Sequence, residues 1–203
     1  MNDILLSFIL GLVQGLTEFL PISSSAHLLL PTLIFGSNDL GLYFDISVHA
    51  GTLIAVVYYF RNEIFLMSKS LLVTNNFNED KNLVIQLIIA TIPIVIIGFI
   101  FRDLISQRIF SINDIAISNI IFASILLFAF LNNKGKKTLI NITILGACFI
   151  GLFQCFALIP GASRSGAAIT AGLLIGLSLK DASKFAFLLA IPTILGALTL
   201  LIF

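Results

Sequence analysis

Residues 11–25 read GLVQGLTEFLPISSS, and residues 151–165 read GLFQCFALIPGASRS. Each stretch is apolar, is broken by proline, glycine or serine, and is followed by more apolar residues, which predicts a helix, a break and a second helix. A glycine, a glutamine and, after a one-residue shift, a proline recur at matching places: Gly11 and Gly151, Gln14 and Gln154, Pro21 and Pro160. Such paired interruptions are typical of membrane proteins whose broken helices meet near the bilayer midplane. Because irregular backbone at that depth must be enclosed by protein or line a polar cavity, we expect both breaks to line one site.

The composition predicts an integral membrane protein. Apolar residues make up 59% of the 203 residues and charged residues only 10%, far from the usual composition of soluble domains. Apolar runs that predict membrane-spanning helices lie at 45–60, 83–101, 115–131 and 185–203. Polar, loop-like breaks lie at 36–44, 74–82, 102–114, 132–138 and 178–184. We therefore predict an all-α, polytopic helical bundle of about eight helical pieces.

We expect one transmembrane domain over residues 1–203, built from two repeats. The first repeat covers 1–133 with a re-entrant pair at 4–35, and a partial second repeat covers 134–203 with a re-entrant pair at 139–177. If the spans between the two pairs cross the membrane fully, the pairs enter from opposite faces and the repeats are inverted.

The basic residues predict the orientation. Under this topology one side carries Arg61, Lys69, Lys81, Lys134, Lys136, Lys137, Lys180 and Lys184. The other side carries Arg102 and Arg108. The positive-inside rule places the first group in the cytoplasm and the N-terminus outside. Because Asp3 and no basic residue precedes the first apolar run, a removable signal peptide is not expected.

Charge and cysteine content exclude several other classes of protein. The net charge of +1 and the lack of a basic arm make no case for nucleic acid as a partner. Cys148 and Cys155 lie seven residues apart in one helical segment, about 10.5 Å along its axis, too far to form a disulfide within an intact helix. Their spacing does not resemble a metal site.

The first break carries candidate catalytic chemistry. Gln14 and Glu18 lie four residues apart, on one face of the helix before the break. Ser23, Ser24 and Ser25 begin the next helix, where hydroxyls cap and free backbone N–H groups attract anions. His27 follows Ser24 by three residues, so the two side chains could serve as nucleophile and proton partner.

The second break predicts phosphate binding. Gly161 is followed by Ser163, Arg164 and Ser165 at another helix start, and Arg164 is the only basic residue between Lys137 and Lys180. An arginine at membrane depth is costly unless it has a partner or an anionic ligand, and its guanidinium matches phosphate oxygens.

Purely structural roles are the alternative for these residues. Ser23 and Ser25 could serve only as caps or turns. His27 could be a hydrogen-bonded core residue, and Arg164 could form a buried ion pair with Glu18 that joins the halves. The same patterns leave Asp45 and His49 without an assigned role.

Two motifs carry a family resemblance. QGLTEFLPISSSAHL (14–28) followed by PGASRSGAAIT (160–170) resembles the signatures of the undecaprenyl-diphosphatase family of bacterial membrane enzymes, which is also linked to bacitracin resistance. FDISVHAGTLIAVVYYFR (44–61) and SKFAFLLAIPTILGA (183–197) resemble its other characteristic segments. The resemblance implies hydrolysis of undecaprenyl diphosphate to undecaprenyl phosphate and phosphate, which recycles the lipid carrier of peptidoglycan synthesis. It also implies an inverted-repeat bundle in the bacterial inner membrane, with an active site facing the periplasm.

The resemblance also suggests roles for individual residues. It places a catalytic and metal-binding glutamate on Glu18, a Glu-or-Gln position on Gln14, and the family's serine and histidine on Ser24 and His27. The expected cofactor is a divalent cation, Mg²⁺ or Ca²⁺, held by Glu18 and Gln14. The full set of predicted catalytic and substrate-binding residues is Gln14, Glu18, Ser23, Ser24, Ser25, His27, Gly161, Ser163, Arg164 and Ser165.

Two departures from the family pattern bear on these expectations. Ala168 stands where relatives commonly have a hydroxyl, and the sequence stops at Phe203, although relatives continue through two further spans. A shortened, inactive relative is therefore one alternative to the enzyme. An inverted-repeat transporter or flippase of a lipid phosphate or small anion is another, because carriers also cradle anions between broken helices.

The hypothesis from the sequence combines both lines of reasoning. Arg164, Ser163 and the two helix N-termini hold the diphosphate, and Glu18 holds the cation. Ser24 attacks the terminal phosphorus or positions a water, and His27 moves the proton. The expected partners are a polyprenyl diphosphate, membrane lipid and, as an open expectation, further copies of the chain.

Overall fold

The computed structural model describes residues 3–72, 79–107 and 110–202. In these residues the regular secondary structure is helical, apart from one isolated bridge between Lys137 and Leu177. The α-helices are α1 (Asp3–Thr17), α2 (Ser24–Phe35), α3 (Gly41–Tyr59), α4 (Arg61–Leu72), α5 (Glu79–Ile100), α6 (Arg102–Ser106), α7 (Ile112–Asn132), α8 (Ile144–Gln154), α9 (Arg164–Leu174) and α10 (Leu179–Ile202). Two short 3₁₀ turns, η1 (Leu139–Asn141) and η2 (Cys155–Leu158), flank α8.

Four of the described helices are long and apolar enough to cross a membrane: α3, α5, α7 and α10. The all-α, polytopic fold predicted from composition is therefore confirmed, and the chain is a multi-pass membrane protein. The spans begin earlier than predicted. In α5, α7 and α10 the polar residues before the apolar run form the first helical turns.

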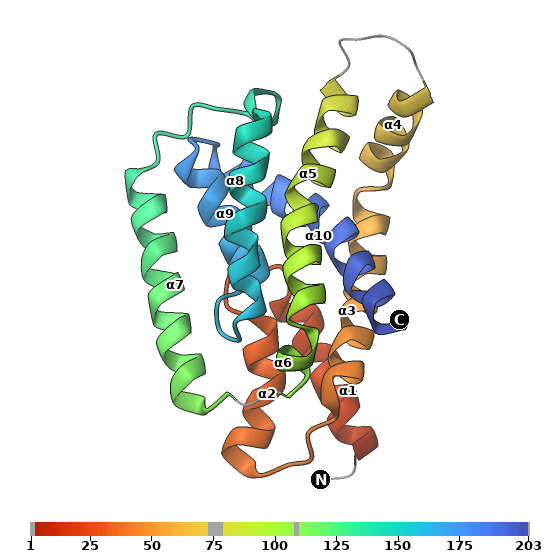
Figure 1. Ribbon diagram of the computed structural model, residues 1–203, viewed down its shortest axis with the longest axis vertical. Coiled ribbons are helices and arrows are strands. Elements are labelled where there is room, and N and C mark those ends of the chain that lie inside the picture. Colours follow the sequence, from red (N-terminus) through yellow and green to blue (C-terminus); the bar gives the residue numbers. More distant parts are fainter. Residues whose placement is uncertain (1–2, 73–78, 108–109, 203) are drawn as a thin grey trace.

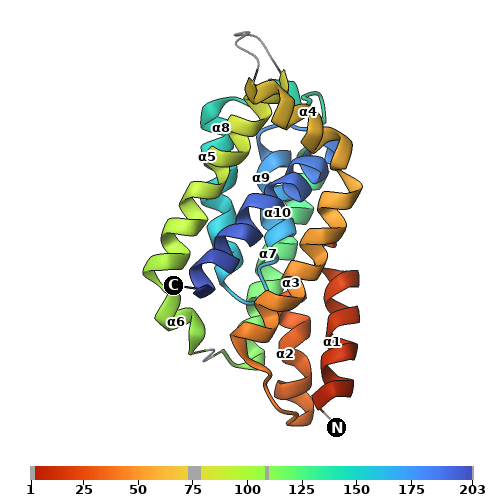
Figure 2. The ribbon, with the colours of Figure 1, turned by 90° about the vertical axis from the view of Figure 1, so that its right-hand side faces the viewer.

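Two helix pairs enter the bundle from opposite ends (Figure 1). α1 runs inward from the N-terminal end, and α2 returns to the same end. α8 starts at the far end, and α9 returns there. The side view in Figure 2 also places α1 and α2 at one end and the start of α8 at the other. This is the inverted arrangement expected from the two broken segments.

The predicted polar break at 178–184 is wrong. α10 begins at Leu179, and Ser178 accepts a hydrogen bond from the Asp181 backbone N–H at 3.1 Å, while its hydroxyl contacts the Asp181 carboxylate. The polar residues there form the first helical turns of α10, as in an N-terminal capping arrangement.

Three other predicted breaks also need correction. The break at 36–44 ends earlier, since α3 starts at Gly41, and the break at 102–114 contains the short helix α6. Of the break at 74–82, residues 79–82 belong to the first turn of α5 and the rest lies outside the described residues, as does Arg108. With these extra pieces, the part of the chain that the structure describes has ten α-helices, against about eight predicted.

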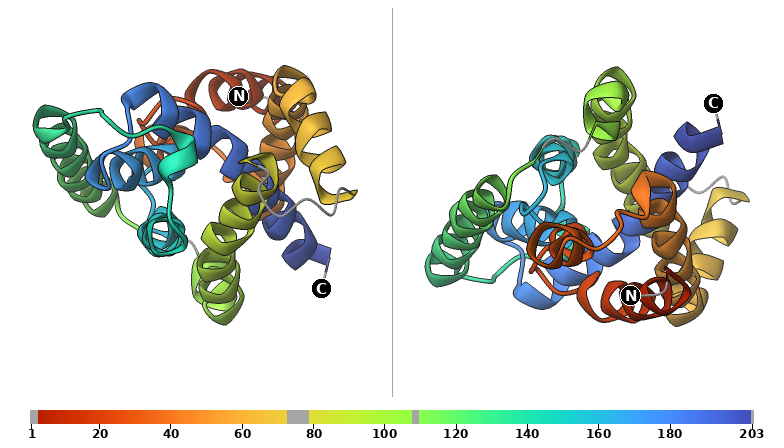
Figure 3. Two further views of the ribbon diagram at one scale, coloured as in Figure 1. Left: turned by 90° about the horizontal axis from the view of Figure 1, so that it is seen from above. Right: turned by 90° about the horizontal axis from the view of Figure 1, so that it is seen from below.

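The core explains why a broken helix is tolerated in the middle of the bundle. α9 is buried from Ser165 to Leu173 and lies between α7, α8 and α10 (Figure 3). α8 packs closely on α5, since a Cβ on Gly151 would lie 2.5 Å from the Ala90 carbonyl oxygen. The irregular start of α9 is therefore enclosed by protein and not by lipid.

The basic residues gather at one end of the bundle, as predicted. α4, the first turns of α5 and α10, and the link between α7 and α8 all lie at the end opposite the N-terminus (Figure 1). These segments carry Arg61, Lys69, Lys81, Lys134, Lys136, Lys137, Lys180 and Lys184. Arg102, on α6, lies toward the other end.

Candidate active site

The two breaks meet through direct hydrogen bonds. The Gly161 backbone N–H donates to Ser23 Oγ at 3.2 Å, and Ser165 Oγ donates to the Leu20 carbonyl at 3.0 Å. Each break thus satisfies polar groups of the other, so buried backbone at this depth is not left unpaired. The two breaks therefore meet in the structure, as their matching interruptions predicted.

The breaks also share an unusual backbone conformation. Ser23 and Ser163 are the non-glycine residues with positive φ in the described chain, at 63° and 58°. In each break the hydroxyl contacts the serine two residues later at 3.3 Å, Ser25 in the first and Ser165 in the second. A left-handed residue of this kind costs about 1–2 kcal/mol, and such strain is concentrated at functional sites.

This shared conformation places the first residues of α2 and α9 at equivalent positions. Those residues are Ser24 and Arg164. Ser163 caps α9 by accepting from the Gly166 N–H at 3.1 Å, whereas Ser23 makes no side-chain cap to α2. Ser163 thus caps its helix. Ser23, for which a cap was the structural alternative, instead binds the opposite break with its hydroxyl.

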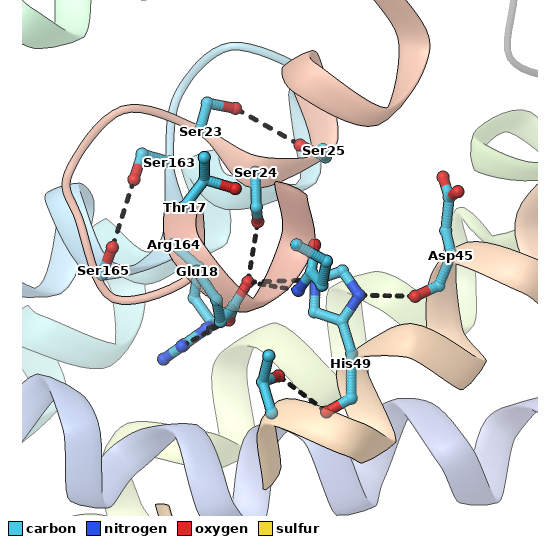
Figure 4. Close-up of polar contacts among 12 residues, drawn as sticks. Thr17, Glu18, Ser23, Ser24, Ser25, Asp45, His49, Ser163, Arg164 and Ser165 are labelled. Atoms are coloured by element: carbon cyan, nitrogen blue, oxygen red, sulfur yellow. Dashed lines mark hydrogen bonds and ion pairs between the residues drawn. The ribbon is translucent and has the colours of Figure 1, made fainter. Parts of the chain in front are cut away.

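Glu18 is the centre of the polar contacts (Figure 4). The residue directly follows α1 and is only 4% exposed. Its Oε2 accepts from Gln14 Nε2 at 2.8 Å and from Ser24 Oγ at 2.7 Å, and lies 3.3 Å from His49 Nε2. A carboxylate can be buried this deeply only when its oxygens are paired with donors or a positive charge.

Arg164 supplies that charge from the opposite break. Its Nε and Nη2 donate to Glu18 Oε1 at 3.2 and 2.6 Å, and its Nη1 donates to the Ala186 carbonyl at 3.2 Å. The ion pair that the sequence left as an alternative is therefore present. It does not exclude a catalytic role, since the same residues line a cavity.

The cavity has a volume of about 170 Å³. Its polar wall consists of Glu18, Ser24, Ser25, His49, Ser163, Arg164 and Thr193. Its apolar wall consists of Ile46, Ile94, Ala157, Ile194 and Ala197. A site with convergent polar groups and an adjoining apolar wall suits a ligand with a charged head and a hydrocarbon tail.

A larger groove of about 680 Å³ lies between α3 and α10 toward the basic end. Its wall is mainly apolar, with Glu63, Lys180 and Lys184 at the rim, and the Glu63–Lys184 ion pair measures 3.2 Å. It contains none of the predicted catalytic residues, so the smaller cavity is the candidate active site.

The two histidines differ in position. His27 directs Nδ1 to the Ser23 carbonyl at 2.8 Å. The histidine among the described residues that line the cavity is His49, not His27. The Ser24 hydroxyl donates to Glu18, and His27 bonds the Ser23 backbone. Proton transfer by His27 therefore stays a prediction. Sequence reasoning left His49 without a role because the approach of α3 to Glu18 is a tertiary contact.

Two other predicted residues, Gly161 and Gln14, are not among the described residues that line the cavity. Gly161 has φ of 99°, and an added Cβ would lie 2.5 Å from Ser118 Oγ, so glycine is required at this position. Gln14 is fully buried and turns its amide nitrogen to Glu18, while its Oε1 has no hydrogen-bond partner among the described residues.

The donor set does not fit a resident divalent cation. Mg²⁺ and Ca²⁺ prefer several oxygen ligands. Here the one carboxylate has both oxygens engaged by Arg164, Ser24, His49 and Gln14, and Gln14 faces it with N–H and not with oxygen. The described residues contain no cluster of three or more His, Cys, Asp or Glu that could hold a metal. The geometry of these residues thus gives no support to a cation at Glu18 and Gln14, which stays a prediction.

Comparison with known proteins shows the family of the chain. Residues 7–203 match the family described as bacitracin resistance protein BacA. The chain belongs to the BacA family. A protein of Alcanivorax borkumensis named undecaprenyl-diphosphatase is 47% identical over 194 residues, which cover 94% of this chain and 73% of that protein. One of the same name from Saccharophagus degradans is 44% identical, over 95% of this chain and 73% of its own length.

Ala168, where we expect a departure from the family pattern, is not among the described residues that line the cavity. Ala168 is 1% exposed and belongs to the main hydrophobic core. The methyl group is therefore compatible with this position, and a hydroxyl here would need a partner inside α9. The nearby Thr170 hydroxyl donates to the Gly166 carbonyl at 2.7 Å, so its hydrogen bond stays within α9.

Proposed function

We propose that this protein hydrolyses undecaprenyl diphosphate to undecaprenyl phosphate and inorganic phosphate, and so recycles the lipid carrier of cell-wall synthesis. The observation that carries the proposal is the convergence of Glu18, Ser24 and Arg164 from two broken helices on one cavity inside a membrane bundle. The names of the similar proteins supply the reaction and the substrate class.

The diphosphate is held by Arg164 and by the starts of α2 and α9. Arg164 uses three N–H groups in its contacts with Glu18 and Ala186, which leaves two of its five donors for phosphate oxygens. Backbone N–H groups in the first turn of a helix attract anions, and both helix starts lie at the cavity. Ser163 lines the same wall.

Ser24 and Glu18 supply the reacting groups. Ser24 Oγ donates to Glu18 Oε2 at 2.7 Å, so the carboxylate is placed to take the hydroxyl proton. In one route Ser24 Oγ forms a bond to the terminal phosphorus, the bridging P–O bond breaks, and its electron pair leaves with undecaprenyl phosphate. Water then releases phosphate from the serine. In the other route Ser24 orients a water that attacks directly.

The cavity and the basic residues together indicate the orientation. The cavity is lined by the first half of α3, the second half of α5 and the second half of α10. These are the halves farther from the end that carries most lysines and arginines (Figure 1). With the basic end in the cytoplasm of a bacterial inner membrane, the cavity faces the periplasmic half, where the diphosphate is presented. The polyprenyl chain extends along the apolar wall of Ile94, Ile194 and Ala197 into lipid.

The test is phosphate release from undecaprenyl diphosphate by purified protein in detergent, with and without Mg²⁺. We expect release by the parent and by Ser47→Ala, an exposed control on α3, and a loss of at least about 100-fold in Ser24→Ala and Arg164→Ala. Tight substrate binding by the parent without release would favour a transporter. If neither binding nor release occurred in folded protein, the assignment would fail.

A further inference from the structure

His49 reaches the site from outside the two broken segments. It lies on α3, lines the cavity, and has a side chain that is 23% exposed, whereas the side chain of Glu18 is 2% exposed. Its Nε2 lies 3.3 Å from Glu18 Oε2, the same oxygen that accepts from Ser24. Figure 4 shows the imidazole and the Ser24 hydroxyl approaching this oxygen from different elements.

The ring of His49 is held in one orientation. Its Nδ1 lies 2.6 Å from the Asp45 carbonyl oxygen, one turn earlier on α3. Because a carbonyl can only accept, Nδ1 carries a hydrogen, and Nε2 is left facing the carboxylate. Glu18 Oε2 accepts the Ser24 hydroxyl and so carries no hydrogen of its own. Nε2 must therefore donate to Oε2, and with both nitrogens protonated the ring is in its cationic form. The hydrogen bond from Nδ1 to a backbone carbonyl thus fixes which way Nε2 points.

Glu18 needs more than one anchor because its two oxygens have different tasks. Arg164 holds Oε1, and Oε2 must point at Ser24 to receive its proton. The residue follows the end of α1, so the helix does not continue past it to restrict its direction. Gln14 and His49 are the two other groups on Oε2, and only His49 comes from a full membrane span.

We propose that His49 is a positioning residue that directs Glu18 Oε2 at Ser24. The proposal rests on the proposed phosphatase reaction and goes beyond it, because it assigns a role to α3 in a site otherwise built from two broken helices. Since His49 acts through Glu18, its loss should lower turnover and leave substrate binding by Arg164 largely intact.

The experiment compares His49→Leu, His49→Gln and the control Ser47→Ala, measuring kcat and KM for phosphate release. The amide nitrogen of glutamine can take the place of Nε2, so it keeps a donor toward Glu18. We expect kcat of His49→Leu to fall by about 10- to 100-fold with KM changed by less than about threefold, and His49→Gln to recover most of the activity. Unchanged kcat in His49→Leu, or equal losses in the leucine and glutamine variants, would overturn the proposal.

A second measurement does not depend on turnover. Melting temperatures in detergent of His49→Leu, Glu18→Gln and the double variant report whether the two side chains interact. We expect the fall in Tm of the double variant to be smaller than the sum of the falls in the two single variants, because His49 and Glu18 are in contact. Additive losses would contradict the contact. An inactive parent with clear coupling would refute the phosphatase assignment and leave the positioning contact in place.

Discussion

Replacing Arg164 with alanine tests whether one ion pair joins the two broken helices. Arg164 donates two hydrogen bonds to Glu18 Oε1 and one to the Ala186 carbonyl, and water has little access to the carboxylate. Removing one partner of a buried ion pair costs about 3–5 kcal/mol, because the remaining charge is left uncompensated. Gln14, Ser24 and His49 still face Glu18, so we expect a loss near the lower end of that range, about 3 kcal/mol.

The assay is thermal unfolding in detergent, followed by circular dichroism. For a chain of this size, about 3 kcal/mol corresponds to a fall in Tm of roughly 6–12 °C. Glu18→Gln removes the charge that Arg164→Ala leaves unpaired, so we expect the double variant to lose less stability than the two single variants together. Ser47→Ala should melt with the parent.

Two results would refute this reasoning. A parent-like Tm in Arg164→Ala would mean that the pair does not hold the breaks together. Strict additivity in the double variant would mean that Glu18 and Arg164 do not interact in the folded protein. In either case Arg164 would act on substrate alone.

Further predictions concern the backbone, the rim and the cation. Gly161→Ala should strongly reduce the yield of folded protein in detergent chromatography, because its Cβ would lie 2.5 Å from Ser118 Oγ at a φ of 99°; normal yield and Tm would contradict this. The pKa of Glu63 is lowered from its ordinary value of 4.5 by a hydrogen bond from the backbone amide of Glu63 and by the hydrogen bond and positive charge of Lys184. The parent should therefore have a higher Tm than Glu63→Gln at neutral pH, and this difference should vanish as the pH falls well below 4.5. A difference in Tm that grew in acid would contradict the prediction. Protein stripped with a chelator should show no Mg²⁺ or Ca²⁺ binding by calorimetry without substrate, because Glu18 is already fully paired; tight binding to the protein alone would establish a resident metal site.

Much of the architecture could be predicted from local sequence. The four spans follow from apolar runs, and the breaks follow from proline, glycine and serine within them. The basic residues predicted which segments share an end. The main local error was at 178–184, where Ser178 and Asp181 read as a loop but form the N-terminal turn of α10. The same polar residues suit both structures, and only the packing of α10 distinguishes them.

The sequence by itself determined which chemical groups enter the membrane: an acid, serines and an arginine in two matching breaks. These features depend on residues a few positions apart, so pattern and spacing are enough to read them. Only the tertiary structure decided that Arg164 pairs with Glu18 and that His49, not His27, faces the carboxylate. The rotation and depth of α3 and α9 against α1 set those contacts, and they result from side-chain packing across the whole bundle.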